Sequence, residues 1–193
     1  MKKFEITAVL QEASRQTLLC RMFLKHDPNC YNCFPLKSSE DLFLYAEEED
    51  FRLDGFVVRR LKDVVEISSK EDITNAILES EGVISELTRP DVDIASWETV
   101  FMYLYANKMN AIFESEDRNS GQIDYTIGRV EKKDDRYMYV RAFDAEGHWE
   151  EKPVRIAYSE LISVSFGTRY VEIFSKYLPV CPVEHDISLL EKK

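Results

Sequence analysis

The chemically distinctive residues of this chain are two small groups of cysteine and histidine. His26, Cys30 and Cys33 follow the spacing His-x3-Cys-x2-Cys, and Cys181 and His185 lie near the end of the sequence. Thiolates and imidazoles at such spacings can converge on a tetrahedral zinc ion. Most of the chain separates the two groups, and a loop at a core edge explains the first group more simply. We therefore expect no metal and no other cofactor, with zinc at these residues as the alternative.

The densest basic run, Arg59, Arg60 and Lys62, is a candidate phosphate-binding patch. An edge strand also carries such charges, because charged side chains block unwanted strand pairing. The whole sequence holds 25 Lys and Arg against 36 Asp and Glu, which gives a net charge of −11. Nucleic-acid binding needs a positive surface. The composition therefore argues against nucleic acid as a partner and favours solvated charges at this run.

No motif of a known catalytic chemistry stands in the sequence. It contains no Gly-x-Ser-x-Gly, no phosphate-binding glycine loop and no His-Glu-x-x-His. The acidic run 47–50 lacks the spaced ligands of a calcium loop, and His148 follows a glycine turn as an exposed residue would. We therefore expect no catalytic residue and a protein that is not an enzyme.

Tyrosines are concentrated in the second half of the chain. Rings of this kind are amphipathic and suit protein interfaces that stay partly wet. Most should lie at the rim of a core, and some can form a partner-binding face. The tyrosines concerned are Tyr103, Tyr105, Tyr125, Tyr137, Tyr139, Tyr158, Tyr170 and Tyr177.

The elements that must position these residues are mostly strands. In the second half, alternation of apolar and polar residues predicts strands, with a helix before them and one after them. The predicted strands are 110–116, 122–131, 136–143, 149–158 and 161–166, and the helices are 96–107 and 168–178. Strand 136–143 is apolar on both faces, which predicts an interior position in the sheet.

The first half has the same kinds of element. A helix is predicted over 3–15, with a strand as the alternative because Phe4, Ile6 and Ala8 alternate with polar residues. A loop is predicted over 26–33 because of its Pro and two Asn. Ser69, with Asp72 three residues on, fits the start of a second helix that stops at Gly82. The strands between these helices cover 17–25, 41–46, 51–60 and 64–67.

An internal repeat relates the two halves. Apolar residues of 42–77 lie over apolar residues of 139–174 at a constant spacing of 97 residues. Two copies of one fold is the economical interpretation. On this interpretation Leu61 and Tyr158 are equivalent inward residues, and so are Ile73 and Tyr170 on the two closing helices.

The second copy resembles the Sm-like family of small barrels. The resemblance lies in a helix that precedes five strands and in the segment 155–164, Arg-Ile-Ala-Tyr-Ser-Glu-Leu-Ile-Ser-Val, which is similar to the family's connection between its fourth and fifth strands. It implies a mainly β fold with flanking helices, made of two bent five-stranded Sm-like barrels in tandem. The family's uridine-binding Asn and Asp have no counterparts, since Asp54-Gly55 follows no matching strand. The resemblance therefore implies the fold and not RNA recognition.

The predicted organisation has four parts. Residues 1–82 form the first Sm-like barrel, 83–95 a linker, 96–178 the second barrel with its N-terminal helix, and 179–193 a tail. With no membrane-spanning run, no signal peptide and only four cysteines, a cytoplasmic location without membrane contact is expected.

We expect a protein-interaction module that acts through barrel edges and an aromatic surface, either on a protein partner or by self-association. Small barrels leave strand edges that another chain can extend. The alternatives are an RNA-binding Sm-like module and an acidic, immunity-type inhibitor of a basic toxin.

Overall fold

The computed structural model describes residues 1–25, 27–117 and 120–184. Over these residues the protein is mainly β-sheet, with ten strands and four α-helices. The chain separates into two compact units, Met1–Ser96 and Trp97–Lys193. The predicted class, mainly β with flanking helices, is confirmed.

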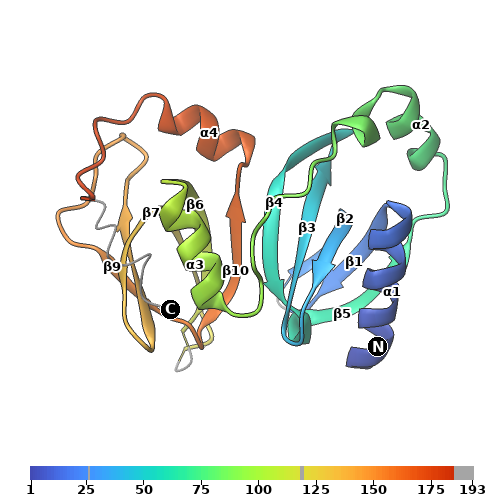
Figure 1. The fold of residues 1–193 in the computed structure, drawn as a ribbon, viewed down its shortest axis with the longest axis horizontal. Coiled ribbons are helices and arrows are strands. Elements are labelled where there is room, and N and C mark those ends of the chain that lie inside the picture. Colours follow the sequence, from blue (N-terminus) through green and yellow to red (C-terminus); the bar gives the residue numbers. More distant parts are fainter. Residues whose placement is uncertain (26, 118–119, 185–193) are drawn as a thin grey trace. The chain divides into compact units, whose positions relative to one another are not determined.

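The first unit has a helix before its five strands and another after them (Figure 1). The strands are hydrogen-bonded in the order β5-β1-β2-β3-β4, so the last strand pairs antiparallel with the first. The elements are α1 (Lys3–Gln16), β1 (Cys20–Leu24), β2 (Asp27–Ser38), β3 (Leu42–Glu49), β4 (Arg52–Arg60), the 3-10 helix η1 (Leu61–Asp63), β5 (Val64–Ser69), α2 (Thr74–Ser80) and the 3-10 helix η2 (Val83–Glu86).

The second unit also has five strands between two helices (Figure 1). Its strands are ordered β10-β6-β7-β8-β9, and its last strand again pairs antiparallel with its first. The elements are α3 (Trp97–Ala106), β6 (Asn110–Glu116), β7 (Ile123–Lys133), β8 (Tyr137–Ala142), β9 (Val154–Ala157), β10 (Leu161–Phe166) and α4 (Arg169–Ser175).

The two units therefore share one order of elements and one order of strands. β10 lies 97 residues after β5 at both of its ends, which is the predicted spacing. β2 has an irregular register between Pro35 and Lys37, and β7 has one between Val130 and Lys132. These two irregularities are 95 residues apart. Tyr45 of β3 lies opposite Pro35, and Val140 of β8 lies opposite Val130, so the spacing is 95 residues there as well. The constant spacing of 97 predicted for 42–77 therefore holds at β5 and is wrong at β3.

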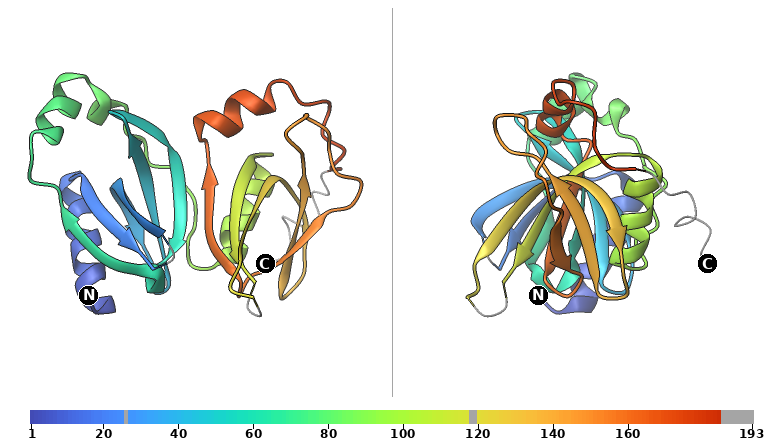
Figure 2. Two further views of the ribbon diagram at one scale, coloured as in Figure 1. Left: turned by 180° about the vertical axis from the view of Figure 1, so that it is seen from behind. Right: turned by 90° about the vertical axis from the view of Figure 1, so that its left-hand side faces the viewer.

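Each unit is covered by its first helix. In α1, Ile6, Leu10 and Ala13 lie on one buried face, and the helix packs on β2 and β5 (Figure 2). Spacing of three and four residues places apolar side chains on one helical face. In the second unit α3 packs against β7 and buries Trp97, Val100, Phe101, Leu104 and Tyr105.

Residues 27–33 form part of a strand, although the composition of 26–33 predicted a loop. Residues from Asp27 onward belong to β2, and Cys33 lies opposite Cys20 of β1 in the register. Pairing with a neighbouring strand outweighs the weak local preference of Pro28 and the two Asn for a turn. Pro28 is exposed near the beginning of β2, a position where a strand tolerates a missing N–H.

The segment 83–95, expected to be a linker, is attached to the first unit. The Arg89 guanidinium donates to the backbone oxygen of Leu36, and the Lys37 ammonium donates to the backbone oxygen of Val92. Val92 itself is fully buried. The segment is thus part of the packing of the first unit.

The closing helices present different residues to the core from those predicted. Ile73 is 74% exposed and Tyr170 is 53% exposed, so neither is an inward residue. The buried residues of α2 and α4 are Leu78 and Val171. The difference arises partly because α2 begins only at Thr74, while the predicted helix start lies in β5.

Candidate functional site

The second unit contains a pocket of about 410 Å³ between the start of β6, β7 and α4. A pocket of this size accommodates a small molecule. Its lining is polar and carries three cationic side chains and one acidic side chain. The lining residues are Lys108, Met109, Asn110, Arg129, Gly167, Val171, Glu172, Ser175 and Lys176.

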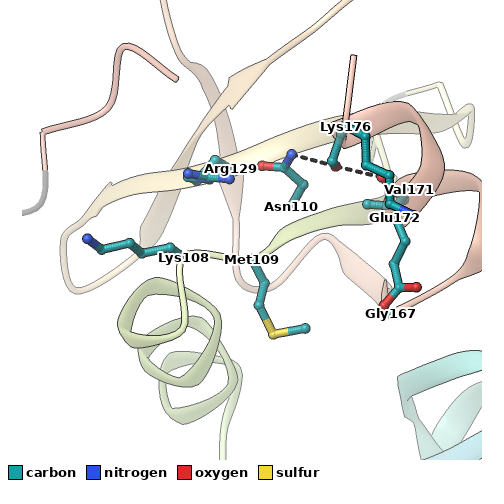
Figure 3. A pocket seen from close by; sticks show the side chains of 9 residues that line it. Lys108, Met109, Asn110, Arg129, Gly167, Val171, Glu172 and Lys176 are labelled. Atoms are coloured by element: carbon teal, nitrogen blue, oxygen red, sulfur yellow. Dashed lines mark hydrogen bonds between the residues drawn. The ribbon is translucent and has the colours of Figure 1, made fainter. Parts of the chain in front are cut away.

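A chain of hydrogen bonds connects α4 to the pocket. The Ser175 hydroxyl donates to the backbone oxygen of Val171, and Asn110 Nδ2 donates to Ser175 Oγ at 2.8 Å. Arg129 Nε then donates to Asn110 Oδ1 at 3.0 Å. Figure 3 shows Arg129 beside Asn110, with the Glu172 side chain directed away from both. The network fixes the orientation of a half-buried arginine at the pocket.

The strand register explains why these two side chains meet. Asn110 opens β6 and lies directly opposite Arg129 of β7. The chain enters β6 from α3 through Lys108, whose φ of 53° is left-handed, and Met109 donates its N–H to the backbone oxygen of Leu104. This tight turn places Lys108 at the rim of the pocket, next to the strand that carries Asn110.

The first unit has apolar residues at the equivalent positions. Ala111 pairs with both Gly128 and Phe166, just as Cys20 pairs with Cys33 and Ser69. Asn110 therefore corresponds to Leu19, and Arg129 corresponds to Phe34. Leu19 and Phe34 are almost completely buried. The polar pair is a property of the second unit alone.

A second feature of the second unit is the edge strand β9 with the tyrosines beside it. Among the described strands β9 has a single neighbour, β8. Val154 of β9 is 38% exposed. In β8, Met138, Val140 and Ala142 are buried but Tyr137 and Tyr139 are half-exposed. The interior position predicted for this strand is confirmed, whereas only one of its faces is fully buried.

Cations lie over both of these tyrosine rings. The Arg155 guanidinium is 4.5 Å from the Tyr137 ring centre, and the Lys132 ammonium is 4.8 Å from that of Tyr139. The Tyr139 hydroxyl donates to Asp134 at 3.0 Å, which raises the pKa of Tyr139. The pKa of Asp134 is lowered, first because the Arg136 N–H donates to it. The face next to β9 is therefore aromatic and charged.

The edge strand of the first unit, β5, is occupied differently. The Met1 ammonium donates to the backbone oxygen of Val65 at 2.8 Å, and the Ile67 N–H points to Met1 Sδ at 3.4 Å. The N-terminal residue thus covers part of the outer edge of β5.

The predicted basic run is not a single exposed patch. Arg59 and Arg60 are each only 7% exposed, and Arg60 forms a buried ion pair with Asp63. Lys62 is exposed in η1. The structure therefore does not bring the three cations together on one surface.

The zinc candidates do not converge among the described residues. Cys30 is exposed and Cys33 is buried in the same strand, where residues an odd number apart face opposite sides. Burial raises the pKa of Cys33 and that of Cys20 opposite it. His26 and His185 lie outside the described residues, as does the rest of the predicted tail beyond Glu184, and Cys181 is half-exposed.

One group of potential metal ligands does come together in the described part of the chain, in the turn before Trp149. Asp144, Glu146 and His148 are all exposed. Asp144 accepts hydrogen bonds from the backbone N–H groups of Glu146 and His148, and the bond from His148 is the main reason for its lowered pKa. This geometry is that of a side chain that stabilises its own turn.

The sequence did not predict the pocket residues Asn110, Arg129 and Ser175.

Comparison of the chain with protein-family models, with curated proteins and with solved structures found no match. Over the described residues, no helix has the length and apolar character needed to cross a membrane.

Proposed function

We propose that the protein is a cytoplasmic, non-enzymatic interaction module, built of two Sm-like barrels in tandem, that self-associates through the edge of β9. The tandem arrangement is supported by the strand order, which is the same in both units, with the fifth strand paired to the first. The partner is a second copy of this chain.

The observation that carries the proposal is the contrast between two edge strands. Within the described part of the chain β9 has one neighbouring strand and an exposed Val154, while part of the outer edge of β5 is covered by Met1. The outer row of N–H and C=O groups on an edge strand is a template for another strand. Two copies of one strand in antiparallel pairing complement each other around a two-fold axis.

The charges near β9 favour the same arrangement. Glu150 and Glu151 precede the strand, and Arg155 lies within it. An antiparallel copy brings the acidic end of one segment toward the cation of the other. Opposite charges across strands are favourable and like charges are unfavourable.

The test is the molar mass in solution over a range of protein concentrations, by sedimentation velocity. We expect the wild type to dimerise as concentration rises and Val154→Lys to stay monomeric, because lysine on an edge strand opposes pairing. The matched control is Val65→Lys, which places the same charge on β5 and should leave dimerisation intact.

A wild type that stays monomeric at every concentration overturns the proposal, and so does a dimer that Val65→Lys alone dissociates.

The cations over Tyr137 and Tyr139 favour single-stranded RNA as the second candidate ligand. Salt-sensitive binding of a short oligouridine by the monomer, lost in Tyr137→Ala, would replace self-association with that candidate.

A further inference from the structure

We propose that the pocket of the second unit binds a small phosphate-bearing molecule, and that Arg129 is the residue that contacts the phosphate. The pocket lies within one unit, between β6, β7 and α4. The proposal is independent of self-association through β9.

The first support is the direction of the hydrogen-bond chain. Each donor in it serves the next acceptor, from Arg129 to Asn110, from Asn110 to Ser175 and from Ser175 to the backbone of α4. Arg129 uses its Nε for this contact. The two terminal Nη groups are left as the pair of parallel donors that matches two oxygens of a phosphate or a carboxylate.

The second support is local charge. Lys108, Arg129 and Lys176 line the pocket of a protein whose net charge is −11, and Glu172 is its only acidic lining residue. Among the described residues, no ion pair joins these three cations to an acid. The Glu172 side chain is directed away from Arg129 (Figure 3). Cations that form no ion pair repel each other, and a bound dianion reduces that repulsion.

The third support is the comparison within the chain. In the first unit the positions next to the equivalent pair Cys20–Cys33 hold the buried residues Leu19 and Phe34 in place of Asn110 and Arg129. The fold therefore does not need the polar pair. In the second unit the buried Asn110 amide connects α4 to Arg129 and so orients the arginine at the pocket, an arrangement that suits a ligand of that arginine.

The size of the pocket favours a small molecule over a nucleic-acid strand. At about 410 Å³ it accepts a group no larger than a typical small ligand. Phosphate is favoured over carboxylate because two lysines add point charges to the arginine fork, which suits a dianion.

The experiment is an NMR titration of the full-length protein with inorganic phosphate, at constant ionic strength set by NaCl. We expect saturable shifts of the Arg129 Nε–H and Asn110 Nδ2–H₂ signals. Arg129→Met should weaken binding by about tenfold or more, since it removes two charge-assisted hydrogen bonds. The matched control is Arg136→Met, an exposed arginine of the same unit that does not line the pocket.

Asn110→Leu combined with Arg129→Phe provides a second variant, which copies the pair of the first unit and tests the site if Arg129→Met fails to fold. It should also lose phosphate binding. Shifts that do not saturate, or that survive in both pocket variants, show an adventitious ion only and overturn the proposal. Tighter binding of malonate than of phosphate overturns the choice of phosphate. Tighter binding of a short oligonucleotide, lost in Arg129→Met, overturns the small-molecule assignment.

Discussion

Asn110 is a buried polar residue whose side-chain oxygen and nitrogen both have hydrogen-bond partners. A buried amide without hydrogen bonds costs about 1–3 kcal/mol on the evidence of protein variants. Asn110 is 7% exposed, and both its Oδ1 and its Nδ2 have partners. The hydrogen bonds of its side chain depend on Arg129 and Ser175, so the three residues act together.

Gly128, next to Arg129 on β7, is required by a close approach of two strands. A methyl group at this position would lie 2.1 Å from the backbone oxygen of Arg141. We expect Gly128→Ala to lower the free energy of unfolding by about 1–3 kcal/mol, because the two strands must separate to admit it. Urea unfolding followed by circular dichroism measures the change.

Thr126→Ala, a half-exposed position on the same strand, is the control and should change stability by less than about 1 kcal/mol. Equal effects at the two positions would show that the approach to Arg141 does not limit the size of residue 128.

The pocket residues leave no signal in the sequence, for a physical reason. Asn110 and Arg129 are 19 positions apart and meet only through the register of β6 and β7. A polar residue at the start of a strand normally faces solvent, so neither residue stands out by type. The cysteines have a sequence pattern but form no site. The spacing of Cys30 and Cys33 is typical of metal ligands, yet the two-residue period of β2 places them on opposite faces.

At the scale of elements, the closing helices allow a direct test of which face is buried. Leu78 of α2 is fully buried, whereas Ile73, the residue just before α2, is 74% exposed. Leu78→Ala should lower the free energy of unfolding by about 2–5 kcal/mol, through lost burial and the cavity left behind. Ile73→Ala should change it by no more than about 0.5 kcal/mol.

Thermal or urea unfolding of the two variants makes the comparison. In the second unit Tyr170 stacks on Phe174 at 5.7 Å between ring centres. Tyr170→Ala should therefore lower the free energy of unfolding by only about 0.5–1.5 kcal/mol. A loss at Ile73 as large as that at Leu78 would contradict the burial described for α2.

Most strands could be predicted because their patterns are local. The bounds predicted for 110–116 and 161–166 agree with β6 and β10, whose alternating or apolar runs are uninterrupted. The predicted strand 149–158 is longer than β9, since Pro153 precedes the first paired residue. The inward position predicted for Ile73 is wrong because a short helix of seven residues offers too few turns to define a buried face by spacing alone.

At the scale of the whole molecule, the burial of two cysteine thiols predicts a loss of stability at alkaline pH. Burial raises the pKa of Cys20 from 9.0 to about 11, and it raises the pKa of Cys33 as well. The folded state then favours the neutral thiol more than the unfolded state does. The stabilisation is complete below pH 9.0 and is lost as pH rises toward about 11, where Cys20 alone accounts for about 2–3 kcal/mol.

Urea unfolding midpoints measured between about pH 8 and pH 11 follow this loss. Cys20→Ala should give a flatter dependence on pH, since it removes one of the two thiols. A wild-type midpoint that does not fall over this range would show that the thiols ionise without opening the first unit.

The pairing of the fifth strand with the first also sets the order in which the molecule can form. In each unit the two strands that complete the sheet are the most distant in the chain, as with Cys20 and Ser69 or Ala111 and Phe166. Contacts between distant residues form late, because loop closure must precede them and slows folding. During synthesis the first unit can complete its sheet once Ser69 has left the ribosome, before any strand of the second unit exists to compete for its edges.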